Sequence, residues 1–257
     1  MPEIGIAGTG AAARLFALRL ASAGLQAVQI APQSRASELS AGMRALRTLV
    51  LAPRDILETE ALLFEGQCLA STLPLLDTII IAATLHPRFV RALRGRIDAG
   101  IGLVDAPWTG TLRAAEEGQI SFFLGGESAV IARHEHLFSA LARGAVRMGE
   151  FGTGMSAKIL SDHFAVASGA LTRLALDWAE AQGLDEAHML DIAGKLLMAP
   201  EMPGFGCDLG DGAGDDRISD LMRGIEASFD TALAGAHLTP PRRTRQITPG
   251  ARPRPLH

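Results

Sequence analysis

Short apolar runs alternate with longer amphipathic stretches over the first 150 residues of the chain. The apolar runs predict buried strands at residues 4–7, 27–30, 48–52, 78–82, 103–104 and 120–124. Between these runs, apolar positions at helical spacing predict helices at residues 14–23, 56–64 and 88–98. Strands that alternate with helices are typical of a doubly wound parallel sheet, so we predict an α/β fold.

One strand of this sheet is expected to be missing. Only 17 residues separate Ile30 from the predicted strand at residues 48–52. A helix, a further strand and their connections do not fit into a segment of this length. We therefore expect one helix there, and a first half of the sheet that lacks its third strand.

The longest amphipathic pattern runs from Met155 to Trp178. It ends near Gly183, a residue type that often follows a helix, and predicts one helix of roughly eight turns. Lys158 lies one turn inside its start among apolar neighbours, and Asp162 follows four residues later on the same face. A lysine in apolar surroundings can lose its proton near neutral pH, which suits it to acid–base chemistry. The alternative is a half-exposed helix lysine in an ordinary ion pair with Asp162.

The remainder of the chain is predicted to be helical and then irregular. Apolar periodicity predicts helices at residues 184–197 and 218–236, whereas prolines and arginines without periodicity predict a disordered tail. The predicted domains are an α/β domain at residues 1–153, a reduced all-α domain at residues 154–238 and a tail at residues 239–257.

Charge and cysteine content narrow the possible partners. A net charge of −4 gives no reason to expect nucleic acid or an anionic membrane. Cys68 and Cys207 lack metal-ligand spacing, so we expect neither a disulfide framework nor a metal site. The chain shows no bilayer-spanning run and no secretory signal, and we expect it to be cytoplasmic. His134 and His136 are expected on a surface helix and are given no function.

A glycine-rich turn joins the first predicted strand to the first predicted helix. In this context the pattern G-x-G-x-x-A is typical of a turn that binds the pyrophosphate of a dinucleotide. Gly8 permits the tight turn, Gly10 lets the backbone approach the phosphates, and Ala13 lets the helix pack on the strand. We predict a Rossmann-like dinucleotide-binding domain; the alternative is a turn that binds nothing. The expected cofactor-binding residues of the turn are Gly8, Thr9, Gly10, Ala11, Ala12 and Ala13.

The segment after the second predicted strand bears on the choice between NAD and NADP. An acid there binds the ribose hydroxyls, whereas an arginine accommodates the 2′-phosphate. Residues 31–35 contain Ser34 and Arg35 and no acid. Both side chains could hold a phosphate, which weakly favours NADP over NAD. The alternative is that Arg35 is a solvated loop residue.

A polar turn, D-A-P-W-T-G-T, occupies residues 105–111 at the end of another predicted strand. The Thr109 hydroxyl and the backbone amides are good donors to a carboxylate, and Gly110 lets a ligand come close. Taken alone, the segment fits an ordinary loop better than a binding site.

Four motifs occur in the order found in the 3-hydroxyisobutyrate dehydrogenase (β-hydroxyacid dehydrogenase) family, which is related to 6-phosphogluconate dehydrogenase. The glycine turn is the first, and Thr84 with Pro87 resembles the family's S-T-x-x-P. D-A-P-W-T-G at residues 105–110 resembles D-A-P-V-S-G-G. G-T-G-M-S-A-K-I-L-S-D at residues 152–162 resembles G-x-G-x-x-x-K-x-x-N-N. The last two motifs are specific to the family, and the resemblance covers most of the chain.

The resemblance implies a catalytic role for Lys158. It matches the family's lysine that exchanges a proton with the substrate oxygen during hydride transfer, and Asp162 matches the active-site asparagine. A nearby carboxylate favours the charged ammonium form, in which a lysine serves as an acid rather than a base. We therefore expect reduction of a carbonyl, or of an imine, to be faster than alcohol oxidation near neutral pH.

The resemblance also implies binding residues. Thr109 and Gly110 match the serine–glycine pair that binds the substrate carboxylate, and Trp108 stands beside them in place of a small valine. Thr84 and the segment 52–53, Ala52 and Pro53, match positions on the nicotinamide side of the cofactor.

Other positions depart from the family pattern. Arg223 stands where the family has a second lysine, and Gly224 stands where an aspartate is expected. Thr109 and Thr111 replace serine and glycine, and the family's final helices are not expected in this chain. These departures keep a second hypothesis open.

We predict an NAD(P)-dependent oxidoreductase that interconverts a small β-hydroxyacid and its semialdehyde or keto form. The alternative is a catalytically impaired nucleotide-binding protein with a sensor or regulatory role on the same fold. The family usually forms oligomers through its helical domain, so we expect a homodimer. Nucleic acid and membranes are not expected as partners.

Overall fold

The computed structural model describes residues 3–30 and 43–198 of the chain. The chain divides into two compact units, Met1–Ala165 and Val166–His257, and the division falls inside the long helix α8 (Thr153–Ala181). Outside the described residues lie the predictions for Ser34, Arg35 and Arg223, for a helix directly after residue 30, for the helix at residues 218–236 and for the tail.

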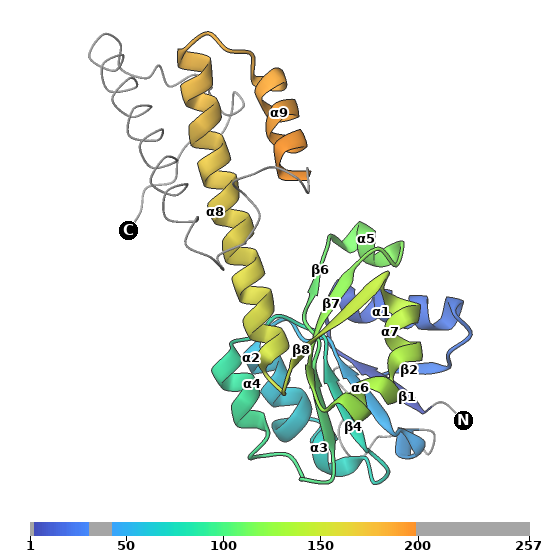
Figure 1. The fold of residues 1–257 in the computed structure, drawn as a ribbon. Coiled ribbons are helices and arrows are strands. Elements are labelled where there is room, and N and C mark those ends of the chain that lie inside the picture. Colours follow the sequence, from blue (N-terminus) through green and yellow to red (C-terminus); the bar gives the residue numbers. More distant parts are fainter. Residues whose placement is uncertain (1–2, 31–42, 199–257) are drawn as a thin grey trace, which may run out of the picture. The chain divides into compact units, whose positions relative to one another are not determined.

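Among the described residues, the first unit contains an eight-stranded sheet in the order β2-β1-β3-β4-β5-β7-β6, with β8 also paired to β7 (Figure 1). The strands are β1 (Ile4–Ala7), β2 (Ala27–Ile30), β3 (Thr48–Leu51), β4 (Thr78–Ile81), β5 (Gly102–Asp105), β6 (Trp108–Thr109), β7 (Ser121–Gly126) and β8 (Gly144–Gly149). Strands β1 to β5 pair in parallel, β7 is antiparallel to β5 and β6, and β8 is parallel to β7.

Helices cover both faces of this sheet. They are α1 (Ala11–Ser22), α2 (Ile56–Glu60), the π-helix η3 (Ala61–Glu65), α3 (Leu69–Thr72), α4 (Pro87–Leu93), α5 (Leu112–Glu116), α6 (Ser128–Arg133) and α7 (Glu135–Leu141), with a short 3-10 helix η2 at Met43–Ala45. Successive residues of a strand point to opposite faces of the sheet, and each face has its own hydrophobic core. Leu49 and Leu51 pack with η3, α3 and α4, whereas Val50 packs with α1, α5, α6 and α7. This two-sided burial confirms the predicted doubly wound α/β fold.

The sheet ends at β2 among the described residues. β1 pairs with β2 on one side and with β3 on the other, so the chain crosses β1 between them. No described strand lies beyond β2. Residues 31–42, which make up most of the segment where we expect the third strand to be missing, lie outside the described residues.

Several elements of the first unit have no clear signal in the sequence. β6, α3 and α5 are only two, four and five residues long, which is too short for periodicity to reveal them. β8 is exposed or half-buried along its whole length and so lacks an apolar run. The helix predicted at residues 88–98 is also shorter than expected, because α4 ends at Leu93.

His134 is buried, so the prediction that it lies on a surface helix is wrong. Its Nδ1 lies 2.8 Å from the carbonyl oxygen of Val130, and its Nε2 lies 3.0 Å from Oγ1 of Thr48. These contacts fit a neutral ring in which Nδ1–H donates to the carbonyl and Nε2 accepts from the hydroxyl. Burial lowers the pKa of His134 because the charged ring is poorly solvated there.

The described part of the second unit is helical, as predicted. α8 continues through it from Val166, and α9 spans Glu186–Met198. Gly183, with a φ of +74°, lies in the turn between the two helices. The carboxylate of Asp185 accepts from the backbone N–H of His188 at 2.8 Å, which caps the start of α9. None of the helices in the described ranges has the length and apolarity needed to cross a membrane.

The buried imidazole of His134 predicts a dependence of stability on pH. A histidine whose pKa is lowered by folding contributes stability above its unfolded pKa of about 6.5, and this contribution is lost as the pH falls through the folded pKa. We expect the free energy of unfolding in urea to fall between pH 7.5 and 5, and to fall less in His134→Gln. The exposed His136, as His136→Gln, serves as the control; equal slopes in the two variants would contradict the assignment.

Candidate active site

The carboxyl ends of four parallel strands form one row in the sheet. The register aligns Ala7 with Leu51, Leu51 with Ile81 and Ile81 with Asp105. Ligands of doubly wound sheets bind beyond this edge. The glycine turn, the Ala52–Pro53 segment, Thr84 and the turn after Asp105 therefore leave the sheet on the same side.

The glycine turn has the geometry that a pyrophosphate requires. Gly8 has a φ of +147°, and a Cβ there would collide with the carbonyl of Ala52, whose carbon would lie 2.8 Å away. The same point lies 3.4 Å from Cβ of Ala13, so helix and strand are closely packed. Gly10 precedes α1 and offers no side-chain cap, which leaves the first amides of the helix available to an anion. The residues present fit a dinucleotide.

A carboxylate that the sequence does not reveal already binds this turn. Oε1 of Glu58 accepts from the backbone N–H of Thr9 at 2.6 Å. Its Oε2 accepts from the backbone N–H of Arg54 at 2.8 Å and from Nε of Arg54 at 3.2 Å. Burial opposes ionisation of Glu58, but these hydrogen bonds outweigh it and lower its pKa. The i,i+4 spacing of Arg54 and Glu58 predicts their pair, whereas the contact with Thr9 depends on the fold.

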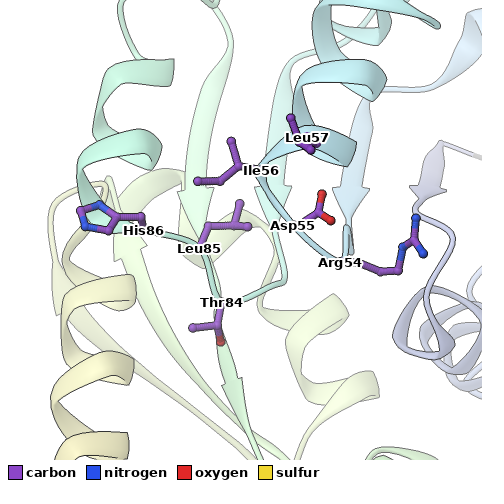
Figure 2. Close-up of a pocket in the computed structure, with 7 residues that line it drawn as sticks. All are labelled: Arg54, Asp55, Ile56, Leu57, Thr84, Leu85 and His86. Carbon is purple, nitrogen blue, oxygen red and sulfur yellow. The ribbon is translucent and has the colours of Figure 1, made fainter. Parts of the chain in front are cut away.

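An apolar cleft of about 360 Å³ opens between the β3–α2 and β4–α4 connections (Figure 2). Its lining residues are Arg54, Asp55, Ile56, Leu57, Thr84, Leu85 and His86. Thr84, which is predicted on the nicotinamide side, lines this cleft. The buried Ala52 and Pro53 come directly before Arg54, which also lines it. The cleft thus lies beside two of the predicted cofactor-binding segments.

The start of α8 is attached to the sheet by Asp105. Both oxygens of its buried carboxylate accept backbone N–H groups, from Gly152 and from Met155, at 2.6 Å each. Gly154 leaves room for this contact, since a Cβ there would lie 2.9 Å from Oδ2 of Asp105. Burial raises the pKa of Asp105, although the two amides favour its charged form. A charged acceptor placed at two amides that lack partners within the helix fixes where the helix begins.

Two further contacts hold the first turns of α8. The backbone N–H of Leu85 donates to Sδ of Met155 at 3.4 Å, and Met155 is fully buried. The guanidinium of Arg91 donates to Oγ of Ser156 at 3.0 Å. The helix is thereby fixed against the loop that lines the cleft.

Lys158 follows one turn later and is only 9% exposed. Its Nζ lies 2.5 Å from both carboxylate oxygens of Asp162, whose side chain is 51% exposed. The pair matches the ordinary helix pair considered from the sequence, but the lysine is buried rather than half-exposed. A buried ammonium needs such a partner, because an unpaired charge there would be strongly destabilising.

The turn after β5 carries the residues predicted to bind substrate. Trp108 and Thr109 form β6, and the Trp108 ring meets Phe16 edge-on with centroids 6.1 Å apart. Thr109 and Gly110 are exposed. The hydroxyl of Thr111 caps α5 by accepting from the backbone N–H of Ala114 at 3.1 Å. Trp108 is thus partly buried and packed against the core, while Thr109 and Gly110 are exposed.

The described contacts bring some predicted residues together and not others. Gly8, Ala13 and Ala52 meet in the glycine turn, and Lys158 meets Asp162. Within residues 3–30 and 43–198, no hydrogen bond or ion pair links Lys158 with Thr109. The same residues contain no cluster of three or more His, Cys, Asp or Glu able to hold a metal ion.

The anchor at Asp105 predicts a loss of stability in Asp105→Asn. The amide would accept from one backbone N–H and present its own NH₂ to the other, which leaves a buried donor unsatisfied at a cost of about 1–3 kcal/mol. We expect this fall in the free energy of unfolding in urea. The exposed Asp98, which accepts from the backbone N–H of Gly100 at 2.7 Å, provides the control Asp98→Asn. Equal stability of the two variants would show that Asp105 does not anchor the helix.

The chain is similar in sequence to several proteins named as dehydrogenases. Mitochondrial 3-hydroxyisobutyrate dehydrogenase of Drosophila melanogaster is 30% identical over 111 residues, which are 42% of this chain and 34% of the relative. L-threonate dehydrogenase of Cupriavidus necator is 26% identical over 163 residues, 63% of this chain and 54% of the relative. The matched part of the chain thus spans about a third to about half of the length of these relatives.

Solved structures show the same fold. 3-Hydroxyisobutyrate dehydrogenase of Mycobacterium tuberculosis has a TM-score of 0.64 at 16% identity, with 92% of this chain and 91% of that chain covered. An imine reductase from Myxococcus stipitatus has a TM-score of 0.65 at 13% identity, with 92% and 87% covered. At these identities the likeness concerns the fold alone.

The family assignment rests on the first unit. The model of the NAD binding domain of 6-phosphogluconate dehydrogenase matches residues 17–149, more than half of the chain. The match begins after the glycine turn and ends before α8, so it is independent of both the phosphate-binding motif and Lys158. The chain therefore belongs to the family of the NAD binding domain of 6-phosphogluconate dehydrogenase.

Proposed function

We propose that the chain is an NAD(P)-dependent oxidoreductase that interconverts a small β-hydroxyacid and its semialdehyde or keto form. The observation that carries this proposal is the buried, paired amine of Lys158, one turn inside a helix that Asp105 attaches to the ligand-binding edge of the sheet. The hydroxyacids named for the relatives support the substrate class.

The residues that would hold the cofactor surround the glycine turn and the cleft. Gly8 to Ala13 would hold the pyrophosphate at the start of α1, while Ala52, Pro53 and Thr84 would lie toward the nicotinamide. When bound, the nicotinamide supplies or accepts a hydride. Ser34 and Arg35 would favour NADP over NAD, and Arg223 is proposed as a further cofactor contact.

The proton of the reaction is assigned to Lys158. In reduction its ammonium group donates a proton to the carbonyl oxygen, and in oxidation its neutral amine accepts the proton of the hydroxyl. Thr109 and the backbone at Gly110 would bind the substrate carboxylate, with Trp108 limiting the space beside them. The Asp162 carboxylate contacts Nζ through both oxygens, and we propose that reduction is the faster direction near neutral pH.

A second candidate function is nucleotide binding without turnover, in a sensor or regulatory role. Trp108 packs against Phe16, and only 17 residues separate Ile30 from β3, a spacing from which we infer a shortened adenosine side. Titration of NADPH against tryptophan fluorescence, followed by turnover assays with small semialdehydes, separates the two. Binding without turnover of any of them would favour the second candidate.

A homodimer through the helical unit is part of the proposal. Large apolar side chains are exposed on α8, on α9 and in the turn between them, namely Val166, Leu171, Leu174, Leu184, Leu190 and Ile192. We also propose a cytoplasmic location and a small carboxylate as the partner.

The assigned role of Lys158 predicts the effect of removing its amine. We expect Lys158→Ala to lower kcat for carbonyl reduction by about 100- to 10,000-fold, the usual contribution of a general acid, with the Kd for NADPH unchanged. Assays would use the semialdehyde or keto forms of the hydroxyacids named for the relatives. Arg173→Ala, which removes an exposed cation from the same helix, serves as the control. Activity of Lys158→Ala within a few-fold of wild type would refute the catalytic role.

The ion pair predicts a change in the direction of catalysis. In Asp162→Asn the negative charge beside Lys158 is lost. We therefore expect the ratio of kcat/KM for oxidation to kcat/KM for reduction to rise at pH 7. Asp177→Asn breaks the analogous pair of Arg173 and Asp177, which are 2.9 Å apart on the same helix, and should leave the ratio unchanged. An unaltered ratio in Asp162→Asn would contradict the assignment.

A further inference from the structure

The Glu58 carboxylate occupies a position that an anionic ligand of the glycine turn would need. The backbone N–H of Thr9 belongs to the turn that would hold a pyrophosphate, and it already donates to Oε1 of Glu58 at 2.6 Å. The Glu58 side chain is only 8% exposed, whereas Thr9 is exposed, so a ligand can reach this contact from solvent. The chain therefore carries its own anion at its phosphate-binding turn.

Arg54 is a cation in direct contact with this carboxylate. Its Cγ lies 3.6 Å from the point where a Cβ of Gly10 would stand, so its side chain passes directly over the turn. Figure 2 shows the side chain pointing away from Ile56 and Leu57, toward the N-terminal segment drawn in violet. Its Nε lies 3.2 Å from Oε2 of Glu58, while 67% of the side chain remains exposed. The guanidinium is thus free to move toward a bound phosphate.

The start of helix α2 does not depend on this arrangement. The carboxylate of Asp55 caps α2 by accepting from the backbone N–H of Glu58 at 2.8 Å. In a capping box, a glutamate at the position of Glu58 returns to the N–H of the capping residue itself. Here it contacts Arg54 instead and crosses to Thr9, which is 49 residues away in sequence. Helix capping therefore does not account for the contact with the glycine turn.

We propose that Glu58 and Arg54 form a latch over the phosphate-binding turn, in which Glu58 competes with the pyrophosphate of the cofactor. When a dinucleotide binds, its pyrophosphate replaces the carboxylate at the N–H of Thr9, and the guanidinium of Arg54 exchanges Glu58 for a phosphate oxygen. Glu58 thus weakens binding through displacement and repulsion of like charges, whereas Arg54 strengthens it. This inference rests on the proposed binding of a nicotinamide dinucleotide.

The latch predicts opposite effects of two neighbouring substitutions. Glu58→Gln removes the competing charge and should lower the Kd for NADPH, NADH and ADP by about tenfold, with no change for adenosine, which has no pyrophosphate. Arg54→Gln should raise the same three Kd values by about tenfold. The matched control is Glu60→Gln, which removes an equal charge from the same helix but from a carboxylate bound by Arg96.

The measurements are calorimetric titrations of the full chain and melting temperatures without nucleotide. Because the contacts of residue 58 with Thr9 and Arg54 weaken, Glu58→Gln should have a lower melting temperature than wild type without nucleotide. Added ADP should raise the melting temperature of Glu58→Gln more than that of wild type. Unchanged or weaker binding in Glu58→Gln would overturn the latch, since a residue that merely orders the turn gives that result. If Glu58→Gln is too unstable to measure, tighter or equal binding in Arg54→Gln would overturn it as well. Failure of wild type and both variants to bind any dinucleotide would refute the proposed function together with the latch.

Discussion

Two backbone N–H groups at the start of α8 donate to one buried carboxylate, that of Asp105. Asp105 ends β5 and stands in the row formed by the last residues of β1, β3 and β4. The helix that carries Lys158 is therefore attached to the edge from which the glycine turn and the cleft also arise. Loss of either hydrogen bond would cost free energy, because it would leave a buried carboxylate oxygen or a backbone N–H without a partner. The position of the Lys158 amine, to which we assign the proton transfer, thus depends on a contact made by other residues.

The charged groups near this edge follow a common arrangement. Lys158 pairs with Asp162, and Arg54 pairs with Glu58, each with a partner four residues away. In both pairs one member is largely buried and the other is exposed to water. Each buried charge therefore has a partner before any ligand arrives. In the proposed function, a cofactor or substrate would have to compete with these internal partners for the same charged groups.

The sequence predicts the elements whose signals are local. Apolar runs and helical periodicity identify the central strands and α8, and the spacing of Gly8, Gly10 and Ala13 identifies the turn between β1 and α1. Other contacts join chain segments that are far apart in sequence, such as Glu58 with Thr9 and Asp105 with Gly152. No periodicity encodes them. The burial of His134 escaped prediction for the same reason, because its partner Thr48 is 86 residues away.

The most direct test of this account is a crystal structure of the full chain with NADPH and a small β-hydroxyacid. We predict that the pyrophosphate lies at the start of α1 and that Nζ of Lys158 lies within about 3.2 Å of the substrate oxygen that carries the reacting proton. A substrate whose carboxylate and hydroxyl bind elsewhere, with Lys158 in contact with Asp162 alone, would contradict it.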